Sequence, residues 1–128
     1  MNLLLDTQAF LWLDSDKDKL STAASQACAD TQNTLWLSVA SAWEMQIKAA
    51  LGKLRFQRSL AELIGSQQST NAIQILPIQL DHVLELQNLP LHHKDPFDRL
   101  LIAQTRQERW KIITSDPEFT KYDVAVVW

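Results

Sequence analysis

Apolar residues along the chain form two kinds of stretch, short solid runs and longer segments with helical spacing. The short runs are strand candidates, and they cover residues 2–6, 35–38, 73–78, 111–115 and 123–128. Helical spacing predicts helices over residues 7–13, 21–29, 39–51, 59–67, 80–86 and 96–109. Because strands and helices alternate, we expect an α/β fold whose mostly parallel sheet is covered by helices on both sides.

Length and composition fit an ordinary globular chain. The 128 residues predict one domain over residues 1–128, and 46% hydrophobic with 21% charged residues argues against disorder. One cysteine, Cys28, excludes an internal disulfide and is compatible with a reducing cytosol.

The apolar N-terminus lacks a basic region and contains Asp6, so neither a signal peptide nor a spanning helix fits. We expect a cytoplasmic protein without membrane contact. Its net charge of −3 means that nucleic acid would need a local basic patch.

Two aspartates follow predicted strands. Asp6 ends the first strand and Asp116 follows the fourth. In open α/β sheets, ligand sites lie at the carboxyl ends of the strands, so both carboxylates are candidates for such a site. For either residue alone, capping of the following helix or turn is the commoner role.

Glu44 stands out because its helical neighbours at i−4, i+3 and i+7 are Ala40, Ile47 and Leu51. This spacing places Glu44 within a stripe that we expect to be buried, and a buried carboxylate needs a partner. The alternative is an exposed pair with Lys48 at i+4, worth about 0.3–0.5 kcal/mol. That pair would require the whole stripe to face water.

The stretch DPFD combines a helix start with a further carboxylate. Asp95 suits the N-cap position, Pro96 the first helical position and Asp98 the first turn. Asp98 nevertheless shares its helix face with the apolar residues Leu101 and Ile102. It therefore presents the same anomaly as Glu44.

Four carboxylates on inward faces or strand ends would repel one another unless a cation neutralised them. Carboxylate oxygens without a compact Cys/His set favour Mg²⁺ or Mn²⁺ over zinc. The histidines lack a zinc spacing and are interpreted as turn or surface residues; they are His82, His92 and His93. Acidic clusters that hold such ions activate water and stabilise the leaving oxygen in phosphodiester hydrolysis.

Four motifs in order resemble those of PIN-domain nucleases, with most similarity to the VapC-like toxins of bacterial toxin–antitoxin pairs. The motifs are LLLDT at the start, SVASAWE at 38–44, DPFDRLLIAQ at 95–104 and TSDPEF at 114–119. The resemblance implies a three-layer α/β/α sandwich with a five-stranded sheet. It also implies a Mg²⁺- or Mn²⁺-dependent endoribonuclease that hydrolyses RNA and is paired with a small cognate antitoxin. Carried over by motif, the catalytic and metal-binding quartet would be Asp6, Glu44, Asp98 and Asp116, with Asp95 as an extra acidic position whose capping role we prefer.

Other residues are candidates for supporting roles. Hydroxyl groups that could orient ligands or water belong to Thr7, Ser38 and Ser115, although local capping explains each of them as well. A basic segment that could guide RNA past the site carries Lys48, Lys53, Arg55 and Arg58, and a solvated helix end explains it equally well. Arg99 could neutralise a phosphate or pair with Asp95, and both remain open.

The apolar residues 9–13 and 126–128 could form a patch for a second copy of the chain, and we expect a homodimer. Burial in the core nevertheless accounts for most of these side chains.

Two other enzyme-like classes fit the sequence poorly. A haloacid-dehalogenase-type phosphatase would carry a second Asp where Gln8 stands, and a receiver domain would carry an Asp where the third strand ends in Leu76 and Pro77. The main alternative is a catalytically silent PIN-like module that binds RNA or protein.

Overall fold

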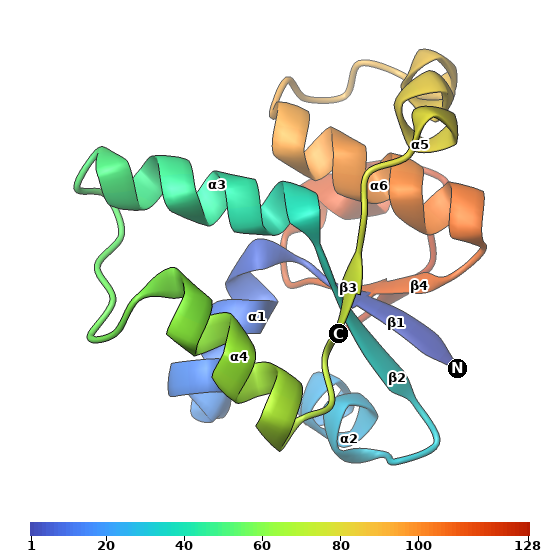
Figure 1. The fold of residues 1–128 in the computed structure, drawn as a ribbon. Coiled ribbons are helices and arrows are strands. Elements are labelled where there is room, and N and C mark those ends of the chain that lie inside the picture. The colour runs from blue at the N-terminus through green and yellow to red at the C-terminus, as the bar shows by residue number, and fades with distance from the viewer.

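The computed structural model describes all of residues 1–128 and contains one sheet of five strands. The strands are β1 (Asn2–Leu5), β2 (Thr34–Ser38), β3 (Gln74–Leu76), β4 (Lys111–Ile113) and β5 (Val126–Val127). Their order is β3-β2-β1-β4-β5, and every neighbouring pair is parallel (Figure 1). Because β1 is central and all strands run the same way, the chain leaves β1, β2 and β4 at one edge of the sheet.

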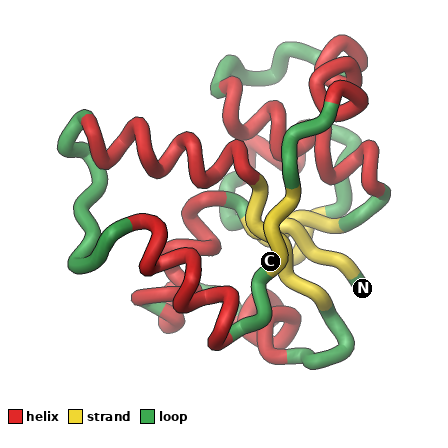
Figure 2. The backbone as a smooth tube through the Cα atoms, viewed as in Figure 1, coloured by secondary structure: helices red, strands yellow, loops and turns green.

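Helices cover both faces of this sheet. They are α1 (Thr7–Ser15), α2 (Thr22–Ala29), α3 (Val39–Ala50), α4 (Leu60–Thr70), α5 (Leu80–Glu85) and α6 (Pro96–Glu108). Short 3₁₀ turns are η1 (Lys17–Lys19), η2 (Leu86–Asn88) and η3 (Pro117–Lys121). Figure 2 shows the strands gathered at the centre with helices around them.

Alternation along β1 divides the core into two clusters. Leu3 and Leu5 point to one face and pack with residues of α1, α2 and α4. Leu4 points to the other face, where it packs with Leu101 and Ile102 of α6. The predicted α/β/α sandwich with a five-stranded sheet is therefore confirmed, and the sheet is entirely parallel. The extent of one domain over residues 1–128 stays a prediction.

Predicted elements differ from the structure mainly at their ends. The third strand stops at Leu76 because Pro77 has no N–H to donate to a ladder. The last strand is shorter than 123–128, and the helix predicted over 59–67 continues to Thr70. Gly52 has φ +71° and its N–H donates to the Ala49 carbonyl, as expected of the residue that ends α3. No helix is long and apolar enough to cross a bilayer.

Candidate functional site

Five carboxylates line one cavity of about 630 Å³ at the carboxyl edge of the sheet. They come from four separate parts of the chain that the parallel topology brings together, and they are Asp6, Glu44, Asp95, Asp98 and Asp116. The predicted quartet therefore shares one cavity with the predicted extra acidic residue. Lys48 and Lys53 also line it, so the cavity carries both signs of charge.

Asp6 links the end of β1 to the start of α1. One carboxylate oxygen accepts the Ala9 N–H at 2.7 Å, which caps α1, and the other accepts the Thr114 hydroxyl. Burial raises the pKa of Asp6 to about 6, even though these two hydrogen bonds lower it. The charges of Asp116 and Glu44 add to the rise. The predicted capping role and the cavity position thus hold for the same side chain.

Glu44 is 5% exposed and uses both carboxylate oxygens. Oε1 accepts the Thr7 hydroxyl at 2.6 Å, and Oε2 pairs with the Lys48 ammonium at 2.8 Å. The predicted burial of its whole stripe is wrong, since Ile47 is partly exposed and Leu51 is 64% exposed. The C-terminal half of α3 extends beyond the sheet (Figure 1), so only its first turns are covered. Burial of Glu44 and the Lys48 pair, which we treated as alternatives, occur together.

Asp98 lies in the first turn of α6 and is partly buried. Burial raises its pKa to about 7, and the charges of Asp95, Glu44, Asp116 and Asp6 raise it further. Asp95 is exposed and accepts the N–H groups of Phe97 and Asp98, so its predicted capping role is present. Leu101 and Ile102 are fully buried, as their spacing from Asp98 predicted.

Asp116 begins η3. Its carboxylate accepts the Glu118 N–H at 2.9 Å, and its own N–H donates to the Thr114 hydroxyl oxygen at 3.1 Å. Thr114 is thus hydrogen-bonded to two of the acidic residues, and sequence reasoning did not single it out. The only available signal was its place within the motif TSDPEF.

The donor set suits a hard divalent cation, because the cavity offers carboxylate oxygens and no histidine or cysteine lines it. As placed, no three of the chain's His, Cys, Asp or Glu side chains come close enough together to form a metal cluster. Glu44 is engaged by Thr7 and Lys48, and Asp6 by Ala9 and Thr114. The carboxylates therefore line a common cavity, and their side chains would have to move closer together to hold one ion.

The predicted supporting hydroxyl groups behave differently from one another. Thr7 contacts the Glu44 carboxylate, and Ser115 lines the cavity. Ser38 instead caps α3 through the Ala40 N–H and donates to Gln104 Oε1 at 2.6 Å. Ser38 contacts none of the cavity carboxylates, so of its two predicted roles the structure shows capping.

The predicted basic residues divide into three groups. Lys48 and Lys53 line the acidic cavity, whereas Arg55 and Arg58 line an adjoining one of about 590 Å³. Arg58 pairs with Asp14 at 2.7 Å. Arg99 donates to the main-chain carbonyls of Leu89 and Pro90 and to the Tyr122 hydroxyl, and no Arg99–Asp95 pair forms. Of the two interpretations of Arg99, pairing with Asp95 is therefore wrong.

His82 is not the turn or surface residue that we expected. It is fully buried in α5, where Nδ1 accepts the Gln79 N–H and Nε2 lies 2.8 Å from the Glu108 carboxylate of α6. Its partner lies 26 positions away in the sequence, beyond the reach of local pattern analysis. His82 ties α5 to α6 and does not line the acidic cavity.

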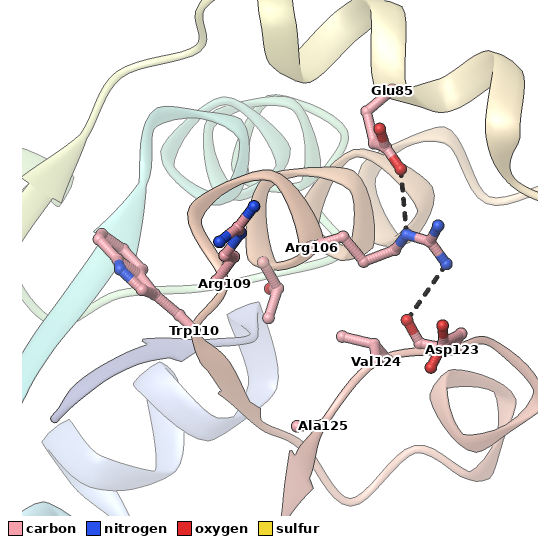
Figure 3. Close-up of a pocket in the computed structure, with 8 residues that line it drawn as sticks. Glu85, Arg106, Arg109, Trp110, Asp123, Val124 and Ala125 are labelled. Atoms are coloured by element: carbon pink, nitrogen blue, oxygen red, sulfur yellow. Dashed lines mark hydrogen bonds and ion pairs between the residues drawn. The ribbon is translucent and has the colours of Figure 1, made fainter.

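A third cavity, of about 310 Å³, lies beside the C-terminal end of α6 (Figure 3). Arg106 crosses it and makes two hydrogen bonds there, with Glu85 Oε1 at 3.1 Å from its Nε and the Asp123 carbonyl oxygen at 3.2 Å from Nη1. This arrangement holds α5 and the C-terminal segment against α6. The acidic cavity remains the candidate functional site.

Comparison with known proteins agrees with the fold. A sequence model of the PIN domain matches residues 3–125, and the chain belongs to this family. No curated protein matches the sequence.

Solved structures with the same fold include complexes of toxins and antitoxins. VapBC2 from Rickettsia felis bound to a promoter DNA fragment is 12% identical, with a TM-score of 0.73 over 98% of this chain and 97% of that chain. DNA-bound VapBC from Salmonella typhimurium is 13% identical, with a TM-score of 0.67 over 98% and 96%. FitAcB from Neisseria gonorrhoeae is 16% identical, with a TM-score of 0.65 over 97% and 95%. At these identities the similarity establishes the fold.

Proposed function

We propose that this protein is a Mg²⁺- or Mn²⁺-dependent endoribonuclease that acts as the toxin of a toxin–antitoxin pair. The observation that carries the proposal is the cavity that five carboxylates share at the carboxyl edge of a PIN-domain sheet. In two of them, Asp6 and Asp98, burial and neighbouring charges raise the pKa to about 6 and about 7. A concentration of negative charge that costs stability is typical of a site built to bind a cation.

In this proposal the ion is held by Asp6, Glu44, Asp98 and Asp116. When bound, it would activate water and stabilise the leaving oxygen of a phosphodiester. The chain's own groups prepare the site. Thr114 and the Ala9 N–H hold Asp6, and Thr7 and Lys48 hold Glu44. Asp95 caps α6 and adds negative charge beside Asp98.

The RNA backbone would follow the basic residues around the cavity. Lys53 lies on its wall, and Arg55 and Arg58 continue along the adjoining cavity. The two cavities share Gln8, Leu11, Trp12 and Leu54, so they lie side by side. A local basic path is needed because the chain's overall net charge of −3 does not attract RNA.

We also propose a small cognate antitoxin as partner, a homodimer as the assembly, and the cytoplasm as the place of action. Structurally similar proteins were solved as VapBC and FitAB complexes, which supports an antitoxin. Residues 9–13, expected as part of a patch for a second copy, are mostly in the core, with Ala9, Phe10 and Leu13 buried. The homodimer is supported instead by other apolar side chains that remain exposed, which are Val39 and Trp43 of α3, Leu51 directly after it, and Leu80 and Leu84 of α5. Light scattering on the purified chain tests the dimer.

A catalytically silent PIN-like binding module is the alternative. Such a module has no need of mutually repelling carboxylates, and all four quartet positions are acidic here. The presence of all four carboxylates favours an enzyme over a silent binding module.

The deciding experiment is cleavage of single-stranded RNA by the wild type and by Glu44→Gln. The substitution removes a charge but keeps an oxygen that accepts from Thr7, so the fold should survive and cleavage should be lost. Glu62→Gln, an exposed change in α4 outside the cavity, is the matched control and should cleave normally. Calorimetry with Mn²⁺ should show much weaker binding to Asp6→Asn than to wild type. A Glu44→Gln protein that cleaves RNA as wild type does would overturn the quartet assignment.

A further inference from the structure

The Tyr122 hydroxyl joins three groups beside the acidic cavity. Its oxygen accepts the main-chain N–H of His93 at 3.2 Å and an N–H of Arg99 Nη1 at 3.1 Å. Arg99 is held in place because it also donates to the carbonyls of Leu89 and Pro90. The hydroxyl oxygen is therefore fully occupied as an acceptor.

This arrangement determines the tautomer of His93. The ring nitrogen Nδ1 lies 2.7 Å from the Tyr122 oxygen. Since that oxygen already accepts two hydrogen bonds, its own proton is directed to Nδ1, which accepts it. The proton of the neutral imidazole is then on Nε2. Nε2 faces Asp98 Oδ2 at 3.4 Å.

His93 is also the only group of the protein that donates a hydrogen bond to the Asp98 carboxylate. Both side chains are largely covered, at 14% exposed for His93 and 21% for Asp98. The distance of 3.4 Å is at the long end for a hydrogen bond, so the contact directs the carboxylate more than it neutralises it.

We infer that His93 is a positioning residue that turns the Asp98 carboxylate toward the cavity, and that Tyr122 and Arg99 fix its tautomer. The inference rests on the proposed function, in which Asp98 holds a divalent cation. Removing a residue that hydrogen-bonds to a metal ligand and orients it commonly lowers metal affinity by about 10–100-fold. The segment HHKDPFD thus carries a cap in Asp95, a candidate ligand in Asp98, and in His93 the group that orients that ligand.

Two substitutions of His93 separate this role from simple packing. In His93→Gln the side-chain amide N–H can take the place of Nε2–H and reach Asp98. In His93→Asn the shorter amide lies where Nδ1 was, so it can contact Tyr122 but cannot reach Asp98. Calorimetry with Mn²⁺ should show His93→Gln within about threefold of wild type and His93→Asn about tenfold weaker. Equal Mn²⁺ affinities of His93→Asn and wild type would overturn the inference while leaving the proposed metal site in place. Absence of Mn²⁺ binding to wild type would instead overturn the proposed function.

A second measurement needs neither metal nor a variant of His93. Long-range ¹H–¹⁵N spectra at pH 8.5 should show His93 with Nδ1 unprotonated and Nε2 protonated. Tyr122→Phe, which removes the hydroxyl, should lose this strict preference. A spectrum in which wild-type His93 carries its proton on Nδ1 would overturn the inference, because Nε2 could then donate nothing to Asp98.

Discussion

At the scale of single residues, two acidic side chains of the cavity, Asp98 and Asp6, are more costly to ionise than ordinary carboxylates. Burial and neighbouring charges raise the pKa of Asp98 from 3.8 to about 7 and that of Asp6 to about 6. A raised pKa means that the folded state holds the proton more tightly than the unfolded chain does. The stabilisation this provides is fully present below about pH 4 and is lost as the pH rises through about 7.

We therefore predict that Asp98→Asn stabilises the metal-free protein at pH 8 and has little effect at pH 4. At pH 8 wild-type Asp98 is ionised against Asp95 and the quartet, and the substitution removes that charge. Its free energy of unfolding should rise by about 1–3 kcal/mol, since each unit of pKa shift corresponds to about 1.4 kcal/mol and the neighbouring charges share the cost. Thermal unfolding in chelator measures the change.

The matched control is Asp18→Asn, which alters an exposed carboxylate of η1 away from the cavity. Its melting temperature should stay within about a degree of wild type at both pH values, as expected of a surface substitution. An unchanged or lower melting temperature of Asp98→Asn at pH 8 would show that the carboxylates do not repel one another as placed.

Thr114 gives a second prediction at this scale. Its hydroxyl donates to Asp6 and thereby lowers the pKa of that carboxyl. In Thr114→Val the donor is lost at nearly constant volume, so the pKa of Asp6 should rise above about 6. Mn²⁺ affinity at pH 7 should then fall by about tenfold, and Thr114→Ser should restore it. Equal Mn²⁺ affinities of Thr114→Val and the wild type would show that Asp6 does not depend on this contact.

At the scale of elements, two serines cap helices in contrasting surroundings. Ser38 is fully buried, where it accepts the Ala40 N–H and donates to Gln104. Ser59 is exposed and accepts only the Glu62 N–H among backbone groups. We predict that Ser38→Ala lowers the free energy of unfolding by about 2–3 kcal/mol, because it leaves two buried polar groups unpaired. Ser59→Ala should cost about 1 kcal/mol.

Denaturant titrations measure both losses of unfolding free energy, provided that the free energy falls with denaturant concentration at the same slope in each variant. Mn²⁺ affinity should be unchanged in Ser38→Ala, since Ser38 contacts none of the cavity carboxylates. Equal stabilities of the two variants would contradict the buried role. A selective loss of Mn²⁺ binding in Ser38→Ala would restore the ligand-orienting role expected from the sequence.

Local sequence pattern predicted the helices and strands better than the exposure and the tertiary contacts of their side chains. The α/β class, the helix ends at Gly52 and Asp95 and the burial of Glu44 followed from spacing and capping chemistry. The exposure of Leu51 did not, because periodicity identifies one face of a helix but not how far the helix extends past the sheet. Thr114 and His93 were missed for a related reason. Each acts through a contact with a residue brought near by the fold, which a single sequence does not display.

At the scale of the whole molecule, the central position of β1 explains how residues 6, 44, 98 and 116 meet. Strands β2 and β4 flank β1 in parallel, so the chain leaves all three at the same edge of the sheet. The helix α6 packs on the face that carries Leu4 and brings Asp98 to that edge. The site is thus a property of topology, and no single motif could build it.

The chemistry proposed for this site predicts the ends of the RNA fragments. When water attacks the phosphorus of RNA, the 3′-oxygen leaves, and the products carry 5′-phosphate and 3′-hydroxyl ends. Attack by the substrate's own 2′-hydroxyl would instead leave a cyclic phosphate, and a histidine most often serves as the base in such proton transfers. None of the chain's histidines lines the acidic cavity.

We therefore expect mass spectrometry of the fragments to show 5′-phosphate and 3′-hydroxyl ends, formed only when Mg²⁺ or Mn²⁺ is supplied. A substrate with one 2′-deoxynucleotide at the cleaved position provides the sharper test. It should still be cut at that position, because water attack does not need the 2′-hydroxyl, and Glu44→Gln should cut neither substrate. Cyclic phosphate ends, or resistance of the deoxy substrate, would show that RNA is cleaved by the 2′-hydroxyl route. The acidic cavity would then need a different role, because carboxylates that bind a cation to activate water have no part in that route.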